Sequence, residues 1–280
     1  MNKHAVKAAR KLIELALAED VGDGDITTNN IIPAGIRRKA KMVAKADGVV
    51  AGLPVAEMVF RKLDPNLIWN EVTPDGSKVK SGDVMVEFEG SYRALLTGER
   101  TALNFLQRLS GIATMSAKYA DAVKDFQTVI LDTRKTLPGF NKLDKYAVKT
   151  GGASNHRLGL HDMAMIKDNH IEVAGGITAA VSAVRSSIEH GIKIEVETSN
   201  MAQVQEAIDS KVDIIMLDNM DLKTMRNAVE LIAGRAKVEA SGNITLDRLR
   251  DVAATGVDYI SIGALTHSVT AMDISQRIED

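Results

Sequence analysis

Two kinds of hydrophobic spacing distinguish the N-terminal part of the chain. Apolar residues recur at helical spacing between Val6 and Ala16, which predicts an amphipathic helix packed on the body of the protein. Alternating apolar and polar residues over 39–45 and 84–88 predict strands with one buried face. Between them, Thr73-Pro-Asp-Gly and Lys80-Ser-Gly-Asp are typical of tight turns. Residues 72–90 are therefore predicted to form part of a small β-sandwich.

The middle of the chain, residues 92–126, contains no proline and has apolar residues at helical spacing. This pattern predicts one or two helices that link the two halves. Gly98 and Gly111 are expected to divide or bend this helical region.

The C-terminal half repeats a unit in which a short apolar run is followed by a polar, often helical, stretch. Near-continuous apolar runs are typical of a parallel sheet that is covered on both faces. We expect an α/β fold with a closed or nearly closed barrel, and an open doubly wound sheet is the alternative. The runs are 128–131, 163–166, 192–196, 212–217, 238–240 and 257–262, and helical stretches are expected at 177–190, 201–210, 222–233 and 246–254.

Composition and charge exclude several classes of function. The 280 residues include 35 Lys and Arg against 37 Asp and Glu, so there is no general basic field for nucleic acid. The absence of cysteine excludes disulfides, thiolate metal sites and a cysteine nucleophile. The most apolar stretch, residues 49–60, is too short to span a membrane, and no export signal is visible. A cytoplasmic protein is expected.

Polar residues recur where each predicted strand of the second half ends. In a parallel barrel these ends open on one face, and that face carries the ligands. We therefore expect one shared active site, although loop polarity without a common function is the simpler alternative. The strand ends read Asp132-Thr-Arg-Lys, Lys167-Asp-Asn-His, Glu195-Val-Glu-Thr, Leu217-Asp-Asn, Ser241-Gly-Asn and Ser261-Ile-Gly-Ala.

The side chains at these ends indicate a ligand with several anionic groups. Arginine and lysine bind carboxylates and phosphates, although an exposed surface is their usual location. The candidate cations are Arg134, Lys135, Arg157 and Lys167, with His156 beside them. The carboxylates of Glu197 and Asp218 could bind Mg²⁺ through water, hold sugar hydroxyls, or only neutralise these cations.

The last two loops contain glycines that would allow the backbone to approach a phosphate. These loops follow the strand runs as Ser241-Gly-Asn and Ile262-Gly-Ala. The chain has no GxxxxGK[ST], HExxH or GxSxG motif, so the common P-loop, zinc-protease and serine-hydrolase sites are not indicated.

Taken together and in order, nine motifs resemble those of the nicotinate-nucleotide pyrophosphorylase family, also called quinolinate phosphoribosyltransferases. They cover most of the chain. The motifs are Glu19-Asp-Val-Gly-Asp-Gly-Asp-Ile-Thr-Thr, Gly98-Glu-Arg-Thr-Ala-Leu-Asn, Asp132-Thr-Arg-Lys-Thr-Leu-Pro-Gly, Lys145-Tyr-Ala-Val-Lys-Thr-Gly-Gly-Ala-Ser-Asn-His-Arg, Ile166-Lys-Asp-Asn-His, Glu195-Val-Glu-Thr, Met216-Leu-Asp-Asn-Met, Glu239-Ala-Ser-Gly-Asn-Ile and Ile260-Ser-Ile-Gly-Ala-Leu-Thr-His.

The resemblance implies an N-terminal α/β sandwich domain, residues 1–110, and a C-terminal irregular α/β barrel that is catalytic, residues 111–265. The tail 266–280 is expected on the first domain. The implied activity is that of a pentosyltransferase in NAD biosynthesis. It converts quinolinate and phosphoribosyl pyrophosphate to nicotinate mononucleotide, pyrophosphate and CO₂, with Mg²⁺ as cofactor. A homodimer or a multiple of dimers is implied, without nucleic acid or membrane partners.

The resemblance also implies roles for individual residues, with Lys135, Lys167, Glu197 and Asp218 as the catalytic set. Arg100, Thr133, Arg134, Lys135, His156, Arg157 and Lys167 would surround the quinolinate carboxylates and the pyrophosphate, and Arg100 would reach the neighbouring subunit's site. Glu197 and Asp218 would lie near the ribose and Mg²⁺, binding the ion directly or through water. Ser241, Gly242, Asn243, Ile262, Gly263 and Ala264 would receive the 5′-phosphate.

Three alternatives remain open at this stage. The acceptor could be another aromatic acid such as nicotinate, although two carboxylate sites favour quinolinate. A paralogue associated with molybdenum transport shares the architecture, so the fold alone does not identify the substrate. A binding protein without turnover could also use this fold.

Overall fold

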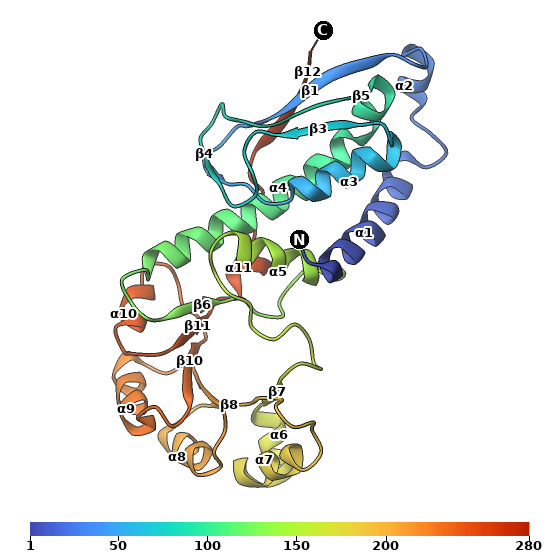
Figure 1. Ribbon diagram of the computed structural model, residues 1–280. Coiled ribbons are helices and arrows are strands. Elements are labelled where there is room, and N and C mark those ends of the chain that lie inside the picture. The colour runs from blue at the N-terminus through green and yellow to red at the C-terminus, as the bar shows by residue number, and fades with distance from the viewer. Residues whose placement is uncertain (280) are drawn as a thin grey trace. The chain divides into compact units, whose positions relative to one another are not determined.

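The computed structural model describes residues 1–279 and contains two compact units that interleave along the chain (Figure 1). The first, here the sandwich unit, comprises residues 1–117 and 136–152 together with the chain from Leu265 onward. The second, the barrel unit, comprises 118–135 and 153–264. The expected tail 266–280 can be followed to Glu279, and Asp280 lies outside the described residues.

The sandwich unit is built on a four-stranded sheet with the order β12-β1-β5-β3. All three of its strand pairs are antiparallel, and a second, two-stranded sheet pairs β2 with β4. The strands predicted at 39–45 and 84–88 are therefore confirmed. The strands are β1 (Arg37–Ala44), β2 (Gly48–Val49), β3 (Ile68–Glu71), β4 (Lys78–Val79), β5 (Val84–Ser91) and β12 (Ile274–Glu279).

The first five helices of the chain lie wholly or mainly in this unit. In the first helix, Ala5, Ala9, Ile13 and Leu17 are buried at a spacing of four residues, which confirms the predicted amphipathic helix. Asn2 caps it by accepting a hydrogen bond from the Ala5 amide. The helices are α1 (Lys3–Val21), α2 (Ile26–Ile31), α3 (Leu53–Leu63), α4 (Tyr92–Ala122) and α5 (Asn141–Thr150).

Helix α4 is a single helix of 31 residues, so neither glycine divides it. Gly111 instead provides space, because a Cβ at this position would lie 2.2 Å from the carbonyl oxygen of Thr270. Gly151, just after α5, makes a similar close approach, since its Cβ would lie 2.2 Å from the Ala113 carbonyl oxygen. The two glycines let separate segments of the sandwich unit pack backbone to backbone against α4.

The barrel unit contains a six-stranded parallel sheet with the order β6-β11-β10-β9-β8-β7. The strands follow one another in chain order, and the first strand lies beside the last. A doubly wound sheet reverses direction from its first strand, so this order confirms the irregular α/β barrel. The strands are β6 (Val129–Leu131), β7 (Ala164–Ile166), β8 (Ile194–Thr198), β9 (Ile214–Asp218), β10 (Lys237–Ser241) and β11 (Tyr259–Ser261).

Helices follow most strands of this unit, as the sequence predicts. The helix predicted over 177–190 ends earlier, at Arg185. The hydroxyls of Ser186 and Ser187 both donate to the carbonyl of Ala183, a local alternative to helix continuation. The helices are α6 (Asp168–Ala174), α7 (Ile177–Arg185), α8 (Met201–Asp209), α9 (Leu222–Ile232) and α10 (Leu249–Ala253). The short α11 (Ala264–His267) follows β11 and belongs to the sandwich unit from Leu265 onward.

A search of the helices within residues 1–279 finds none with the length and apolar character needed to cross a membrane.

We expect Gly111→Ala to lower the free energy of unfolding by about 2 kcal/mol or more, because the new methyl group meets a backbone oxygen that cannot rotate away. Gly98→Ala in the same helix is the control. Its Cβ would meet only side-chain atoms of Leu63 and Phe60, at 2.9 and 3.1 Å. Its cost should be offset by about 1 kcal/mol of helix propensity. Urea unfolding measures both, and equal losses would contradict the packing at Gly111.

Candidate functional site

Most of the residues expected in the active site follow the strands at one edge of the parallel sheet. Strand β6 leads into Asp132 and the segment 133–135, and β7 leads into Lys167. Glu197 is the penultimate residue of β8. Because the strands are parallel, these ends open on the same face of the barrel. The remaining members of the edge are Asp218 at the end of β9, Ser241 with Gly242 and Asn243 after β10, and Ile262, Gly263 and Ala264 after β11.

Lys167 and Glu197 form an ion pair across neighbouring strands. Residues 166 and 196 are register partners, which brings the next residues on each strand together. The Lys167 ammonium nitrogen contacts Oε2 of Glu197. The Lys167 side chain is 44% exposed and that of Glu197 is 20% exposed, so both can be reached from solvent. An ammonium and a carboxylate are thereby fixed side by side at the rim.

The loops after β9 and β10 are joined through one asparagine. Asn219 donates from Nδ2 to Oδ2 of Asp218 at 2.9 Å, and its Oδ1 accepts from Nδ2 of Asn243 at 3.1 Å. The backbone amide of Asn219 also donates to the Ser241 carbonyl at 2.9 Å. Gly242 adopts φ +98°, and a Cβ there would lie 2.3 Å from Oδ1 of Asn219. The glycine therefore leaves space for the asparagine that orients Asp218.

Arg134 and Arg157 act on each other through their like charges. Arg157 is half-buried, and its Nη1 donates to the carbonyl of Met163 at 3.0 Å. Burial, followed by the charge of Arg134, lowers the pKa of the Arg157 guanidinium. Arginine stays charged in proteins, so the two side chains repel each other. An anionic group between them would relieve this repulsion, as in a site for carboxylates or phosphates.

Below the rim lies a group of buried polar side chains that we call the barrel cluster: His156, Glu195, Glu239 and Ser261. Nε2 of His156 is 3.1 Å from Oε2 of Glu195 and 3.2 Å from Oε2 of Glu239. The His156 side chain is 6% exposed and both glutamate side chains are fully buried. The Ser261 hydroxyl donates to Oε1 of Glu239 at 2.6 Å. The cluster therefore holds two carboxylates against one imidazole inside the barrel.

The two glutamates raise the pKa of His156. Burial alone would lower the pKa of His156, but hydrogen bonds with Glu195 and Glu239 outweigh it and raise that pKa to about 10. Burial also raises the pKa of the Glu195 carboxyl, by more than the hydrogen bond from His156 lowers it. The Arg157 amide donates to Nδ1 of His156 at 2.7 Å, so Nε2 carries the ring proton. The imidazole therefore faces both carboxylates with Nε2.

Asp132 fixes the backbone that carries His156. The residue is fully buried. Its Oδ1 accepts from the His156 amide and its Oδ2 accepts from Nδ2 of Asn155, both at 2.8 Å. An isolated parallel bridge between Leu131 and Ser154 aligns this segment with β6. The segment 154–157 is thus held as a seventh, irregular strand position of the barrel.

Sequence reasoning assigned no role to Asp132, Asn219, Glu195 or Glu239. The last two could have been found from strand alternation, because Glu195 lies two residues before Glu197 and Glu239 lies two before Ser241. Residues two apart on a strand point to the same face. No comparable pattern identifies Asn219, whose role depends on the neighbouring loop.

Arg100 is the one expected site residue that lies in the sandwich unit, on the exposed side of α4. Thr133 accepts from the Lys135 amide at 3.1 Å, which shapes the turn that exposes Arg134 and Lys135. These two cations, like the glycine-containing loops, remain predicted substrate ligands.

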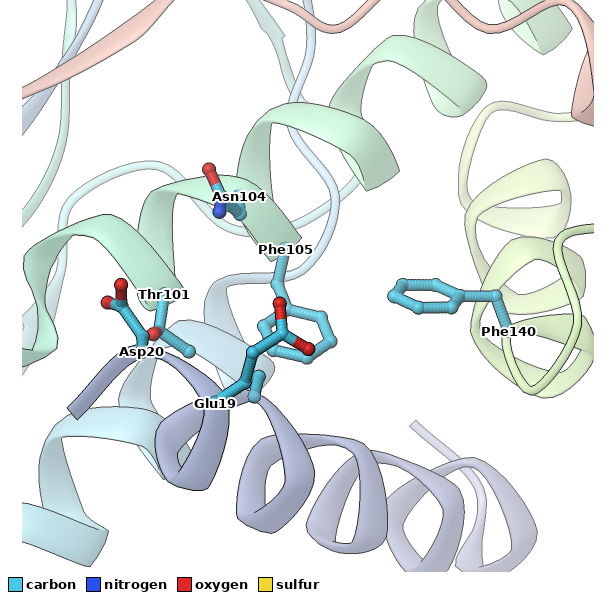
Figure 2. A pocket seen from close by; sticks show the side chains of 7 residues that line it. Glu19, Asp20, Thr101, Asn104, Phe105 and Phe140 are labelled. Atoms are coloured by element: carbon cyan, nitrogen blue, oxygen red, sulfur yellow. The ribbon is translucent and has the colours of Figure 1, made fainter. Parts of the chain in front are cut away.

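The sandwich unit has a cavity of its own, of about 220 Å³, and one of its lining residues is Thr101, which follows Arg100 in the sequence. Figure 2 shows acidic side chains from the end of α1 and polar and aromatic side chains from α4 around it. The Phe105 and Phe140 rings stack with centroids 5.7 Å apart. The lining residues are Ala16, Glu19, Asp20, Thr101, Asn104, Phe105 and Phe140, and several belong to two of the motifs that carry the family resemblance.

Two groups could contact a metal ion. The carboxylates of Glu197 and Asp218 are half-buried at the rim, and hard oxygen donors with access to water fit Mg²⁺. The atoms of His156, Glu195 and Glu239 lie within 4.8 Å of one another, which would allow a shared ion by distance alone. Of the two, only the rim pair is accessible to a substrate.

Sequence models of one family match the chain. The quinolinate phosphoribosyl transferase N-terminal domain matches residues 25–110, and the C-terminal domain matches 112–277. The chain is 48% identical over 267 residues to the probable nicotinate-nucleotide pyrophosphorylase [carboxylating] of Synechocystis sp., covering 94% of this chain and 90% of that protein. It is 44% identical over 295 residues to quinolinate phosphoribosyltransferase [decarboxylating] 1 of Nicotiana glauca, covering 99% and 84%.

Solved structures give the same result. The crystal structure of NadC from Streptococcus pyogenes matches with a TM-score of 0.93 and 42% identity, covering 97% of each chain. The nicotinate-nucleotide pyrophosphorylase from Francisella tularensis matches with a TM-score of 0.94 and 38% identity, covering 98% of this chain and 96% of that one.

Gly242→Ala should force Asn219 away from Asp218 and Asn243 in addition to straining the backbone. Gly256→Ala is a matched control, since its φ is +90° and its nearest new contact is Val229 Cγ1 at 3.3 Å. We expect each substitution to cost about 1 kcal/mol of backbone strain, and Gly242→Ala to cost about 1 kcal/mol more for the lost hydrogen bonds. Urea unfolding compares the two variants, and identical losses would show that Asn219 is not held by this contact.

Proposed function

Because the chain belongs to the quinolinate phosphoribosyl transferase family, we propose that it transfers the phosphoribosyl group of phosphoribosyl pyrophosphate to quinolinate. The products are nicotinate mononucleotide, pyrophosphate and CO₂, so the reaction serves NAD biosynthesis. The observation that carries this proposal is the rim of the barrel, which holds the Lys167–Glu197 ion pair and the mutually repelling Arg134 and Arg157. Such a rim suits a diacid and an activated sugar phosphate.

The cations have a direct task in binding quinolinate. The two adjacent carboxylates of this acid repel each other, and the ring nitrogen must nevertheless approach the sugar. Arg134, Lys135, Arg157 and Lys167 surround the carboxylates and offset that repulsion, with Thr133 beside them. Because these charges are fixed before the substrate arrives, little reorganisation is needed during the reaction.

The carboxylates at the rim act on the sugar. Glu197 and Asp218 accept hydrogen bonds from the ribose hydroxyls, and they are the residues that would hold Mg²⁺, directly or through water. When bound, Mg²⁺ neutralises the charge that develops on the departing pyrophosphate. Lys167 keeps Glu197 in place through their ion pair. The loops at 241–243 and 262–264 receive the 5′-phosphate through backbone amides.

In the proposed reaction every bond formed is matched by a bond broken, and no further cofactor is needed to accept electrons. The quinolinate nitrogen donates its electron pair to C1 of the ribose as the bond from C1 to the pyrophosphate oxygen breaks. The ring becomes a pyridinium, which accepts the electron pair released when the C2 carboxylate leaves as CO₂. A proton from solvent then replaces the lost group at C2. Holding both reactants in line can supply roughly 7–11 kcal/mol of the barrier reduction.

The subunit arrangement follows from the same proposal. Arg100 lies in the motif Gly98-Glu-Arg-Thr and is exposed on α4. In a homodimer, or a multiple of dimers, it reaches the pocket of the neighbouring subunit and adds another cation for the quinolinate carboxylates.

The proposed activity is tested by release of labelled CO₂ from quinolinate labelled in its C2 carboxylate. The purified protein is mixed with phosphoribosyl pyrophosphate and Mg²⁺, and pyrophosphate is measured in parallel. Equal amounts of both products are expected, and addition of a chelator should stop the reaction. Turnover of nicotinate but not quinolinate would identify a different acceptor, and binding without pyrophosphate release would exclude catalysis.

We expect Lys167→Ala to lower kcat about 100-fold while the protein remains folded. The variant removes a charge that faces the substrate and leaves Glu197 without its ion-pair partner. A half-exposed lysine contributes little to stability, so unfolding should change by less than about 1 kcal/mol. Lys193→Ala, an exposed lysine before β8, is the control for steady-state assays. Unchanged turnover of the Lys167 variant would remove this residue from the site.

Mixing two inactive variants tests the shared pocket. Arg100→Ala and Arg157→Ala subunits are each expected to be nearly inactive alone. A mixed dimer has one pocket with both arginines intact, so random exchange of subunits should restore roughly a quarter of the wild-type activity. The recovery is measured by CO₂ release after unfolding and refolding the variants together. Absence of recovery, with mixed dimers demonstrated by mass spectrometry, would contradict a contribution of Arg100 across subunits.

A further inference from the structure

The barrel cluster has contacts that the proposed reaction does not explain. His156 faces two buried glutamates with Nε2, at 3.1 and 3.2 Å. Its side chain is 6% exposed, so the ring presents little surface to a ligand. Two carboxylates inside a barrel are costly unless they are paired and hydrogen-bonded. The arrangement therefore needs a reason beyond packing.

The contacts of the cluster lead to Arg157. The Arg157 amide donates to Nδ1 of His156 at 2.7 Å, so the imidazole links the backbone of this arginine to both glutamates. Glu195 also attracts the Arg157 guanidinium, against the repulsion from Arg134. From the other side, Asp132 holds the His156 amide at 2.8 Å. The position of Arg157 is thereby set through its backbone and through its charge.

The hydrogen-bond directions fix which ring nitrogen is protonated. Because Nδ1 accepts from a backbone amide, the proton of the neutral ring lies on Nε2, the nitrogen that is 3.1 and 3.2 Å from the two glutamates. Ser261 supplies a further donor to Glu239, at 2.6 Å. This is the second layer of contacts that holds an active-site cation in one orientation.

We propose that Glu195 and Glu239 are positioning residues for quinolinate binding, which act through His156 to hold Arg157 where its guanidinium meets a substrate carboxylate. The inference rests on the proposed function. It assigns His156 a place beneath the substrate rather than against it.

A metal ion bound by His156, Glu195 and Glu239 is the competing use of these residues. The imidazole and the two carboxylates lie 3.1 and 3.2 Å apart in direct polar contact, and the hydrogen bonds to Nδ1 and from Ser261 are made without an ion. A dication would also add positive charge next to Arg157 and Arg134, which already repel each other. These observations favour direct contact between the imidazole and the carboxylates.

The test is a double-mutant cycle between Glu195 and Arg157. Glu195→Gln keeps the size of the side chain and removes its charge, and Glu230→Gln, on the exposed side of α9, is the matched control. We expect Glu195→Gln to raise KM for quinolinate about tenfold and to leave KM for phosphoribosyl pyrophosphate within about twofold. In an Arg157→Ala background the same change should alter KM for quinolinate less than about twofold, since the two substitutions remove one function.

Glu239→Gln should repeat this behaviour, because its carboxylate acts through the same imidazole. Equal tenfold effects of Glu195→Gln with and without Arg157 would overturn the proposal, as would equal increases in KM for both substrates. If the wild-type protein releases no CO₂ from quinolinate, the proposed function fails. If the wild-type protein turns over normally but the effects of the Glu195 and Arg157 substitutions simply add, only the positioning role is rejected.

Two measurements on the wild-type protein apply even where a variant does not fold. Nitrogen NMR of histidine-labelled protein should show one slowly exchanging ring proton, on Nε2, in a histidine whose Nδ1 accepts a hydrogen bond. A protonated Nδ1 in that histidine would overturn the proposal. Elemental analysis after dialysis against a chelator should find no stoichiometric metal, and a retained ion that Glu239→Gln releases would overturn it in favour of a metal site.

Discussion

The structure depends on one topological constraint: parallel strands that follow each other in chain order all end on the same face of the barrel. Arg134 and Ala264 are far apart in sequence, yet β6 and β11 are hydrogen-bonded neighbours. Every strand of the barrel therefore delivers its next polar residue to one rim. The Lys167–Glu197 pair and the Asp218–Asn219–Asn243 contacts are direct results of that arrangement.

Positively charged side chains are concentrated at the rim, and buried carboxylates inside the barrel offset part of their charge. Arg157 is repelled by Arg134 and attracted by Glu195 below it. The buried glutamates have polar neighbours here, because Ser261 donates a hydrogen bond to Glu239 and His156 lies 3.1 and 3.2 Å from the two carboxylates. The electrostatic field that would draw in a polyanionic substrate is thus built in two layers, an exposed cationic rim and a buried layer that neutralises and orients it.

In the sandwich unit, glycines permit close packing between separate segments of the backbone. Gly111 allows the Thr270 carbonyl to pack against α4. Gly151 likewise allows the end of α5 to approach the Ala113 carbonyl. A sequence pattern alone suggested that Gly111 would bend or divide the helix, because glycine has a low helix propensity. The helix continues because the tertiary contact at this glycine is worth more than the local preference.

The sequence by itself determined the α/β class, the positions of the barrel strands along the chain and the polar residues that follow them, because hydrophobic runs and the polar residues after them are local signals. The choice between a barrel and a doubly wound sheet was decided by the strand pairing in the tertiary structure. It also identified the family, through motifs such as Asp132-Thr-Arg-Lys and Ile166-Lys-Asp-Asn-His. Only the tertiary structure decided which side chains meet. The bond from the Arg157 amide to His156, the two glutamates that face this imidazole and the fit of Asn219 over Gly242 all join segments on different strands or depend on backbone geometry. Periodicity reports the face on which a residue lies, whereas the partner on that face depends on strand register and loop conformation, which distant parts of the chain impose.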